Sequence, residues 1–224
     1  MSTQTSILST KTLSSEQRQA FIDAEIDLLE QDFIEKENID FELDNINQNL
    51  IFSSQNAVLS LLEQSNWKNL TAKNTFCVGM KTKELLKQNG FKVDVYMDYA
   101  SELAEIITLI YNKESFTFFS GNLRKETLPQ ALKNAGITFS EIEVYQTKLA
   151  PFEISKSEQF DGILFFSPSG VESYLKDNKI KKEICFCVGE TTAGALNKIT
   201  KNLVIPENPS VENLVEETIK YYNN

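Results

Sequence analysis

Short apolar stretches rich in β-branched and aromatic residues alternate along the chain with amphipathic stretches of helical period. This alternation predicts parallel sheets covered by helices. Several of these stretches are apolar at successive positions, without alternation, as expected of strands buried on both faces. The expected strands are 6–10, 26–34, 50–54, 75–79, 93–97, 116–121, 140–147, 162–167, 183–189 and 202–206. The expected helices are 16–24, 57–64, 83–89, 103–111, 123–134, 171–176, 193–198 and 211–222.

One module occurs twice: a strand ending in serine, a helix, a strand ending in Val-Gly, and a helix with threonine in its first turn. The first copy contains IFSSQNAVLSLL (51–62) and FCVGMKTKELL (76–86). The second contains FFSPSGVESYL (165–175) and FCVGETTAGAL (186–196). The repeat predicts two related α/β domains, and we expect a ligand cleft between them.

The repeat also predicts where the domains begin and end. The first copy has five expected strands, the second has three, and two N-terminal strands are left to complete the second sheet. We therefore expect a discontinuous domain of residues 1–38 and 151–224 and an inserted domain over 42–147. The chain then passes between domains near 33–41 and 144–152, and we expect these segments to pair as a two-stranded antiparallel ladder.

Charge and composition exclude several classes of function. The net charge of −10 argues against nucleic acid and anionic membranes, because both attract basic surfaces. The chain has no histidine, which excludes Ser-His-Asp hydrolysis, Cys-His nucleophiles and His-ligated zinc. Acid–base chemistry must then come from Tyr, Lys or carboxylates.

The cysteines and the N-terminal sequence bear on the compartment. Three cysteines are too few for a disulfide framework. The N-terminal residues do not resemble a secretory signal, and no apolar run approaches a membrane span, so we expect a cytoplasmic protein. Cys185 and Cys187 lie two residues apart on one strand, so both point to the same face, and no other Cys or His is nearby. We interpret both as packing residues, and we expect no metal.

Small polar residues follow five of the expected strands. Ligands of open parallel sheets bind outside the carboxyl ends of the strands, and helix starts attract carboxylates and phosphates. Helix capping alone also explains such residues, but five such turns in two domains favour a ligand-binding role. The sequence has neither GxxxxGK[ST] nor GxGxxG, which disfavours phosphate-cradle enzymes. The turns are 53–56, 79–82, 120–122, 167–170 and 189–192.

Four cations and one tyrosine of the inserted domain are further candidates for the binding site. Lys81, Lys83, Arg124 and Lys125 lie at expected helix starts, where cations oppose the helix dipole. They indicate either an anionic ligand or a solvated face. Tyr145 lies at the end of a strand beside an expected passage between domains, where it either packs with a hydrogen-bonded tip or faces the cleft.

Several strings resemble the uroporphyrinogen-III synthase family. FFSGNLRKETLPQALKNAGITFSEIEVYQT (118–147) is similar to the central segment of that family. IFSSQNAV, FFSPSGVESYL and CVGETTAGAL are similar to three of its strand-end turns, and the resemblance extends over about 49–219. The family usually has Thr-Arg-Pro after its first strand, where this chain has Thr10-Lys11-Thr12, so the role of Lys11 stays open.

The resemblance implies two flavodoxin-like domains joined by the ladder, without a cofactor. It implies the cyclisation of hydroxymethylbilane to uroporphyrinogen III, with inversion of the terminal pyrrole ring and loss of water. Tyr145 would give a proton to the leaving hydroxyl. We also expect a monomer, with transient contact with the bilane-producing enzyme. The implied substrate-binding residues are Ser53, Ser54, Thr82, Gly121, Asn122, Ser167, Ser169, Thr191 and Thr192.

Two other interpretations remain open. The same cleft could belong to a binding protein that closes on an anionic small molecule without chemistry, although the missing signal disfavours a periplasmic one. The second interpretation is a regulatory module derived from this fold. Such modules often carry a DNA-binding appendage, and the two expected domains leave no residues of this sequence for one. An octacarboxylate substrate and a protein of charge −10 repel at long range. Helix starts and a few Lys or Arg residues would have to reverse the sign of the potential locally.

Overall fold

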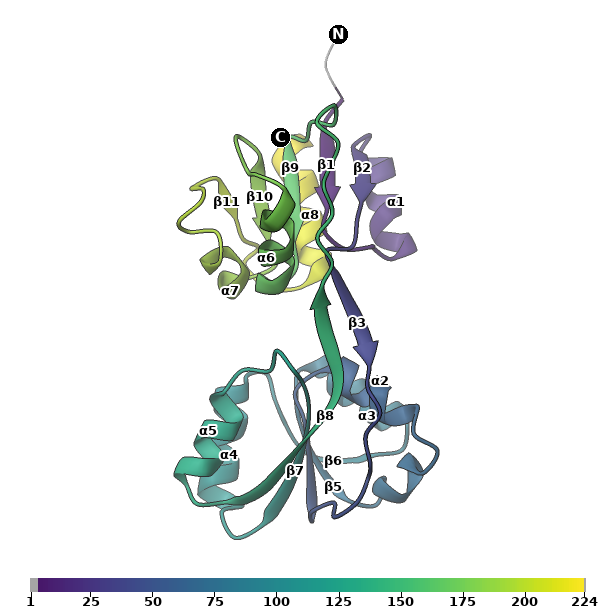
Figure 1. The fold of residues 1–224 in the computed structure, drawn as a ribbon, viewed down its shortest axis with the longest axis vertical. Helices are drawn as coiled ribbons and strands as arrows, with labels where there is room; N and C mark the ends of the chain where they lie inside the picture. Colours follow the sequence, from purple (N-terminus) through teal and green to yellow (C-terminus); the bar gives the residue numbers. More distant parts are fainter. Residues whose placement is uncertain (1–3, 224) are drawn as a thin grey trace. The chain divides into compact units, whose positions relative to one another are not determined.

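The computed structural model describes residues 4–223, and the first three residues of the expected discontinuous domain and Asn224 lie outside this part. The chain forms two compact units: unit 1 contains Met1–Glu35 and Lys148–Asn224, and unit 2 contains Lys36–Thr147. Each unit is an α/β structure with helices on both faces of a mainly parallel sheet (Figure 1). No helix in residues 4–223 is both long enough and apolar enough to span a membrane.

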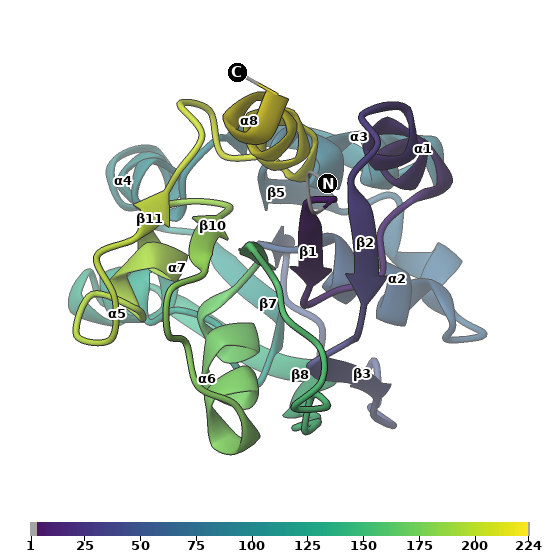
Figure 2. The same cartoon turned by 90° about the horizontal axis from the view of Figure 1, so that it is seen from above.

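Unit 1 contains a five-stranded sheet of order β11-β10-β9-β1-β2, in which all neighbouring strands are parallel. Helices α1 and α8 cover one face of this sheet, and α6 and α7 cover the other (Figure 2). The strands are β1 (Ser6–Ser9), β2 (Asp27–Glu30), β9 (Gly162–Phe165), β10 (Ile184–Cys187) and β11 (Leu203–Val204). The helices are α1 (Ser15–Asp23), α6 (Pro168–Asp177), α7 (Glu190–Gly194) and α8 (Val211–Asn223).

Unit 2 contains a six-stranded sheet of order β3-β8-β7-β4-β5-β6. Its edge strand β3 lies beside β8, and the arrows of these two strands run in opposite directions (Figure 1). The strands are β3 (Ile34–Asn38), β4 (Asn49–Phe52), β5 (Asn74–Val78), β6 (Lys92–Met97), β7 (Ser115–Gly121) and β8 (Thr138–Leu149). The helices are α2 (Gln55–Leu62), the 3₁₀ turn η1 (Trp67–Leu70), α3 (Met80–Gln88), α4 (Ala100–Ile110) and α5 (Thr127–Asn134).

Apolar residues on successive positions of a central strand explain why both faces of each sheet are covered. Ile51 on β4 packs with α4 and α5, whereas its neighbours Leu50 and Phe52 pack with α2 and α3. In unit 1, Ile7 and Leu8 likewise belong to core clusters on opposite faces. Side chains of a strand alternate between faces, so an uninterrupted apolar run specifies a strand that is buried on both sides.

The repeated module has the same arrangement in both sheets. Strands β4, β5 and β6 correspond to β9, β10 and β11, and the N-terminal β1 and β2 take the places of β7 and β8. In chain order, unit 1 is a 2-1-3-4-5 sheet, which is the flavodoxin-like order. In unit 2, the parallel strands lie side by side in the order β6-β5-β4-β7-β8. Numbered by their place in the chain, this order is 3-2-1-4-5, which is typical of Rossmann-type sheets. Unit 1 therefore has the strand order of the expected flavodoxin-like domain, whereas unit 2 has the same spatial arrangement of strands with a different order along the chain.

Several expected elements differ from those in the structure. The strand expected over 26–34 is two strands, because the amide of Gln31 donates to Ser9 O and that of Phe33 to Thr10 O as the chain leaves the sheet. The helix expected from residue 123 begins at Thr127, so the 120–122 turn does not open a helix directly. The 3₁₀ turn η1 is an additional element, and the helix expected over 193–198 is the short α7, which begins at Glu190.

Candidate active site

The strand order places a switch point of unit 2 between β4 and β7, and ligands of open α/β sheets bind at such points. Ser53 and Ser54 follow β4 directly, and Gly121 is the last residue of β7. The pairing of β7 with β8 shifts between Ser120 and Gly121, so that Gly121 lies opposite Tyr145. A bulge of this kind re-aims a side chain. It brings Tyr145 to the strand ends that the sequence singled out.

Tyr145 is hydrogen-bonded to Ser54. The phenolic oxygen lies 3.1 Å from Ser54 Oγ, and either oxygen can be the donor. Ser54 is also the N-cap of α2, because its Oγ accepts a hydrogen bond of 3.2 Å from the amide of Ala57. Its own proton is therefore available to Tyr145. When Ser54 donates, the proton of Tyr145 is free to be given to another acceptor.

The Gly121–Asn122 turn holds Tyr145 from the other side. A Cβ atom on Gly121 would lie 2.5 Å from Cε2 and 2.9 Å from Cε1 of Tyr145, so the ring occupies the space of a side chain. The Asn122 side chain accepts from the amide of Thr147 at 2.8 Å and donates to its carbonyl at 3.2 Å. The oxygen and the nitrogen of the Asn122 side chain therefore both bond to the backbone of β8, two residues from Tyr145. Substrate binding by Asn122 and Gly121 stays a prediction.

A cavity of about 380 Å³ lies at this edge of unit 2. It is lined by apolar side chains and by three charged residues, Asp98, Arg124 and Lys125. Tyr99 and Leu123 expose more than half of their surface beside it. Ser53, Ser54, Gly121 and Tyr145 also line this cavity.

Asp98 and Tyr99 line this cavity, although they are not among the residues predicted from the sequence. They follow β6 in the same way that the five singled-out turns follow their strands, and that position is the signal that could have identified them. Asp98 accepts a short hydrogen bond from the hydroxyl of Tyr96, which raises the pKa of Tyr96 to about 12.

Arg124 is compensated by two carboxylates. Its Nε lies 2.5 Å from Glu141 Oε2, and its Nη1 is paired with Glu126. The hydrogen bonds to Glu141 and Glu126 raise the pKa of Arg124 above its ordinary value. The contact with Glu141 gives Arg124 a structural partner on β8, which its position at an expected helix start did not predict.

Lys83, another of the expected cations, lies over the ring of Tyr96, with its Nζ 4.5 Å from the ring centre.

The corresponding switch point of unit 1 lies between β1 and β9. Ser167 caps α6 by accepting a hydrogen bond of 3.1 Å from the amide of Gly170, and its Oγ lies 3.0 Å from Ser169 Oγ. Thr10 Oγ1 donates to the carbonyl of Leu164 at 2.7 Å. Lys11 Nζ lies 5.9 Å from the ring centre of Phe166. Serine caps therefore stand at the matching strand ends of both units.

The paired threonines also occupy matching positions. Thr82 and Thr192 donate their amides to the carbonyls of Gly79 and Gly189, at 3.1 and 3.0 Å, in the first turns of α3 and α7. Both side chains are buried, whereas Thr191 is exposed. The buried threonines shape the two Val-Gly turns, and contact of any of these threonines with substrate stays a prediction.

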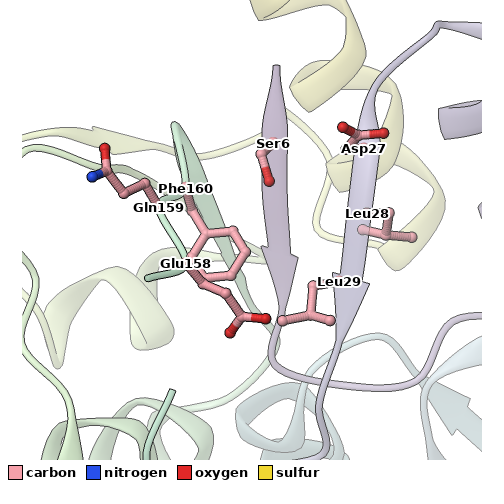
Figure 3. Close-up of a pocket in the computed structure, with 7 residues that line it drawn as sticks. All are labelled: Ser6, Asp27, Leu28, Leu29, Glu158, Gln159 and Phe160. Carbon is pink, nitrogen blue, oxygen red and sulfur yellow. The ribbon is translucent and has the colours of Figure 1, made fainter. Parts of the chain in front are cut away.

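Two cavities of unit 1 lie at the opposite end of its strands. One, of about 390 Å³, lies where β1 and β2 begin (Figure 3). Its charged residues are the carboxylates Asp27 and Glu158, which would repel an anionic ligand. The other, of about 830 Å³, lies next to the loops before β9 and β10, and its four lysines and four acidic residues offset each other. Neither cavity contains a strand-end residue singled out by the sequence.

The cysteines behave as packing residues. Cys185 and Cys187 lie in the core of unit 1, and burial raises the pKa of each thiol to about 12. Cys77 lies in the core of unit 2, where burial raises its pKa to about 11. Protonated thiols are poor nucleophiles and poor metal ligands. Within the described part of the chain, no group of three or more metal-ligating side chains is present.

These features define the class: a two-unit α/β protein whose parallel sheets are flanked by helices and carry polar strand ends. The model of the family described as uroporphyrinogen-III synthase HemD matches residues 17–216. A uroporphyrinogen-III synthase of Chlorobaculum parvum is 25% identical over 195 residues, covering 76% of this chain and 79% of the relative. The chain belongs to the uroporphyrinogen-III synthase family.

Solved structures show the same fold. Uroporphyrinogen-III synthetase from Helicobacter pylori superposes with a TM-score of 0.74 at 23% identity, covering 97% of this chain and 99% of that one. A mutant uroporphyrinogen III synthase from Thermus thermophilus gives a TM-score of 0.71 at 15% identity, with 98% of both chains covered. The fold is thus retained at identities where sequence comparison alone is weak.

Proposed function

We propose that this protein is a uroporphyrinogen-III synthase of heme biosynthesis, which cyclises hydroxymethylbilane to uroporphyrinogen III. Family membership supports this activity. The observation within the chain that carries it is the pair of Tyr145 and Ser54, whose hydroxyls lie 3.1 Å apart at the edge of a strand-end cavity.

The proposed first step is the loss of the substrate hydroxyl as water. The C–O bond of the hydroxymethyl group breaks, the Tyr145 proton goes to the leaving oxygen, and the pyrrole electrons form an azafulvene. Ser54 donates to the tyrosine oxygen and stabilises the negative charge that develops there. The azafulvene carbon is then attacked by the substituted carbon of the terminal pyrrole, giving a spiro-pyrrolenine.

Fragmentation and recombination of the spiro-pyrrolenine invert the terminal ring. Loss of a carbon-bound proton restores the aromatic pyrrole, and this proton balances the one that Tyr145 gave up. The net reaction releases one water. One acid and a fixed substrate conformation are sufficient, because the bilane is reactive without help. A protein without histidine can therefore carry out this reaction.

Substrate carboxylates would bind at the serine-capped starts of α2 and α6, where free amides and the helix dipole attract anions. The predicted substrate-binding threonines and Gly121 would shape these turns. We propose that residues of both units contact one substrate, and that the β3–β8 pair, where the chain passes between units at residues 35–36 and 147–148, serves as a hinge. We further propose that the protein is a cytoplasmic monomer that makes transient contact with the bilane-producing enzyme.

Product analysis tests this function. Purified protein is incubated with hydroxymethylbilane, the products are oxidised to porphyrins, and isomers I and III are separated. We expect isomer III to dominate. Isomer I alone, formed at the uncatalysed rate, would contradict the proposal and favour a binding protein without catalysis.

A further inference from the structure

The ammonium of Lys36 lies over the ring of Tyr145. Lys36 belongs to β3, at the edge of the sheet of unit 2, and its Nζ lies 5.8 Å from the ring centre of Tyr145. Its side chain is exposed. A cation at this distance from an aromatic face is attracted to the ring and so stays near it. Neither the module repeat nor the strand-end turns pointed to this residue.

Lys36 differs from Arg124 in the availability of its charge. The guanidinium of Arg124 is paired with Glu126 and Glu141 and is only a quarter exposed. Among residues 4–223, Lys36 takes part in no ion pair, and its contact is with the Tyr145 ring. An exposed, uncompensated ammonium binds an incoming carboxylate without first giving up a partner.

The position of this charge matters because the protein carries −10 overall and the substrate is a polycarboxylate. Long-range repulsion has to be reversed near the reacting group, and charges act there within about 8 Å at physiological salt. The Lys36 ammonium lies within that distance of Tyr145. Lys125 lines the adjoining cavity and adds a second positive charge.

We propose that Lys36 binds a carboxylate of the substrate beside Tyr145, so that the ring bearing the hydroxymethyl group is held with its leaving hydroxyl toward the phenol. This role rests on the proposed synthase function. It assigns to β3 a part in substrate recognition in addition to its place in the sheet.

Substitution of Lys36 tests the proposal. Lys36→Met keeps an unbranched side chain of similar length and removes its charge, and Lys36→Arg restores the charge. For Lys36→Met we expect the KM for hydroxymethylbilane to rise about tenfold with kcat changed less than about threefold, as for loss of one charged contact. Lys36→Arg should return KM to within about twofold of the wild-type value. The KM of Lys36→Met should also depend less on salt concentration.

Lys68→Met is the matched control. Lys68 Nζ lies 5.9 Å from the ring of Trp67, so the same kind of contact is removed in η1, which precedes β5. We expect this control to keep the wild-type KM. An unchanged KM in Lys36→Met, or a lowered kcat alone, would overturn carboxylate binding by Lys36. Wild-type protein that makes only isomer I would instead overturn the synthase function.

Discussion

Tyr145 is held by its hydroxyl, its ring and its strand at once: Ser54 bonds the hydroxyl, Gly121 contacts the ring, and the bulge in β8 aims the side chain. Tyr145→Phe removes the proton and leaves the other two constraints. We expect kcat for isomer III to fall at least about 100-fold, as is typical for loss of a general acid. The free energy of unfolding should change by about 1 kcal/mol, the usual value for one hydrogen bond.

Tyr96→Phe provides the control for this substitution. Tyr96 is also hydrogen-bonded in unit 2, to Asp98, but it is not the proposed acid. Isomer assays and thermal unfolding of both variants separate catalysis from stability. A Tyr145→Phe variant with the wild-type rate would remove the tyrosine from the mechanism and would leave the family assignment standing.

The close approach of Gly121 to the Tyr145 ring leads to a second prediction. In Gly121→Ala the new Cβ would lie 2.5 Å from Tyr145 Cε2, so the ring has to shift, which disturbs its hydrogen bond to Ser54. We expect kcat to fall at least about tenfold, because small displacements of a catalytic group are costly. Gly194→Ala is the control, since within the described residues no heavy atom would lie within 4 Å of its Cβ.

A double variant distinguishes displacement of Tyr145 from general damage. If Gly121→Ala acts through the tyrosine, adding it to Tyr145→Phe should lower kcat by less than about threefold further, because the two residues act on one step. Multiplicative losses would show that Gly121 affects the site by another route.

At the scale of secondary-structure elements, the two units share helices that begin with a serine N-cap. Ser167→Ala removes the hydrogen bond to the Gly170 amide at the start of α6. We expect a loss of about 1 kcal/mol in the free energy of unfolding, as for other serine caps. If this helix start also binds a substrate carboxylate, KM should rise about fivefold as well.

Ser14→Ala separates these two effects. Ser14 caps α1 through the amide of Gln17 at 3.2 Å, and it lies outside the predicted binding residues. Denaturant unfolding should show a similar destabilisation of both variants. Only Ser167→Ala should raise KM, and equal KM values in the two variants would mean that Ser167 is a cap and nothing more.

The limits of prediction are clearest in particular elements. The buried strands β4, β7 and β9 are evident from their apolar runs, because such runs are specific to strands covered on both faces. The predicted start of α5 is four residues early, since Asn122 and Arg124 are held by Thr147 and Glu141 on β8. Contacts between residues so far apart in sequence leave no trace in local periodicity.

At the site, the sequence predicts the residues but not the contacts between them. The sequence singles out Tyr145 and Ser54 separately, from a strand end and from a helix cap. Their hydrogen bond depends on the order of the strands and on the register shift opposite Gly121. The cation that contacts Tyr145 could not be found from helix starts, because Lys36 comes from an edge strand.

At the scale of the whole molecule, the repeat determines how the chain divides. Strands β1 and β2 come from the N-terminus, yet β1 lies inside the sheet of unit 1 between β9 and β2. All five parallel strands of unit 2 instead come from one continuous segment. Counting strands in each copy was sufficient to place β1 and β2 in the second sheet, although it did not reveal that the two chain orders differ.

This difference predicts how fragments of the chain fold. Residues 36–147, expressed alone, should unfold cooperatively on heating, because the segment contains both core clusters of unit 2. Residues 148–224 alone should not, since the fragment lacks β1, whose Ile7 and Leu8 are fully buried in the two core clusters of unit 1. Circular dichroism during heating and dispersion of amide signals in NMR spectra measure both outcomes.

Complementation gives the decisive control. Residues 1–35 supply β1, β2 and α1, so mixing them with residues 148–224 should restore a cooperative transition that neither fragment shows alone. A cooperative fold in 148–224 by itself would mean that the central place of β1 is not required and would contradict the discontinuous domain. Folding of 36–147 only in the intact chain would contradict the inserted one. Because the two fragments are measured separately, the result shows which of the two domain assignments is wrong if one of them fails.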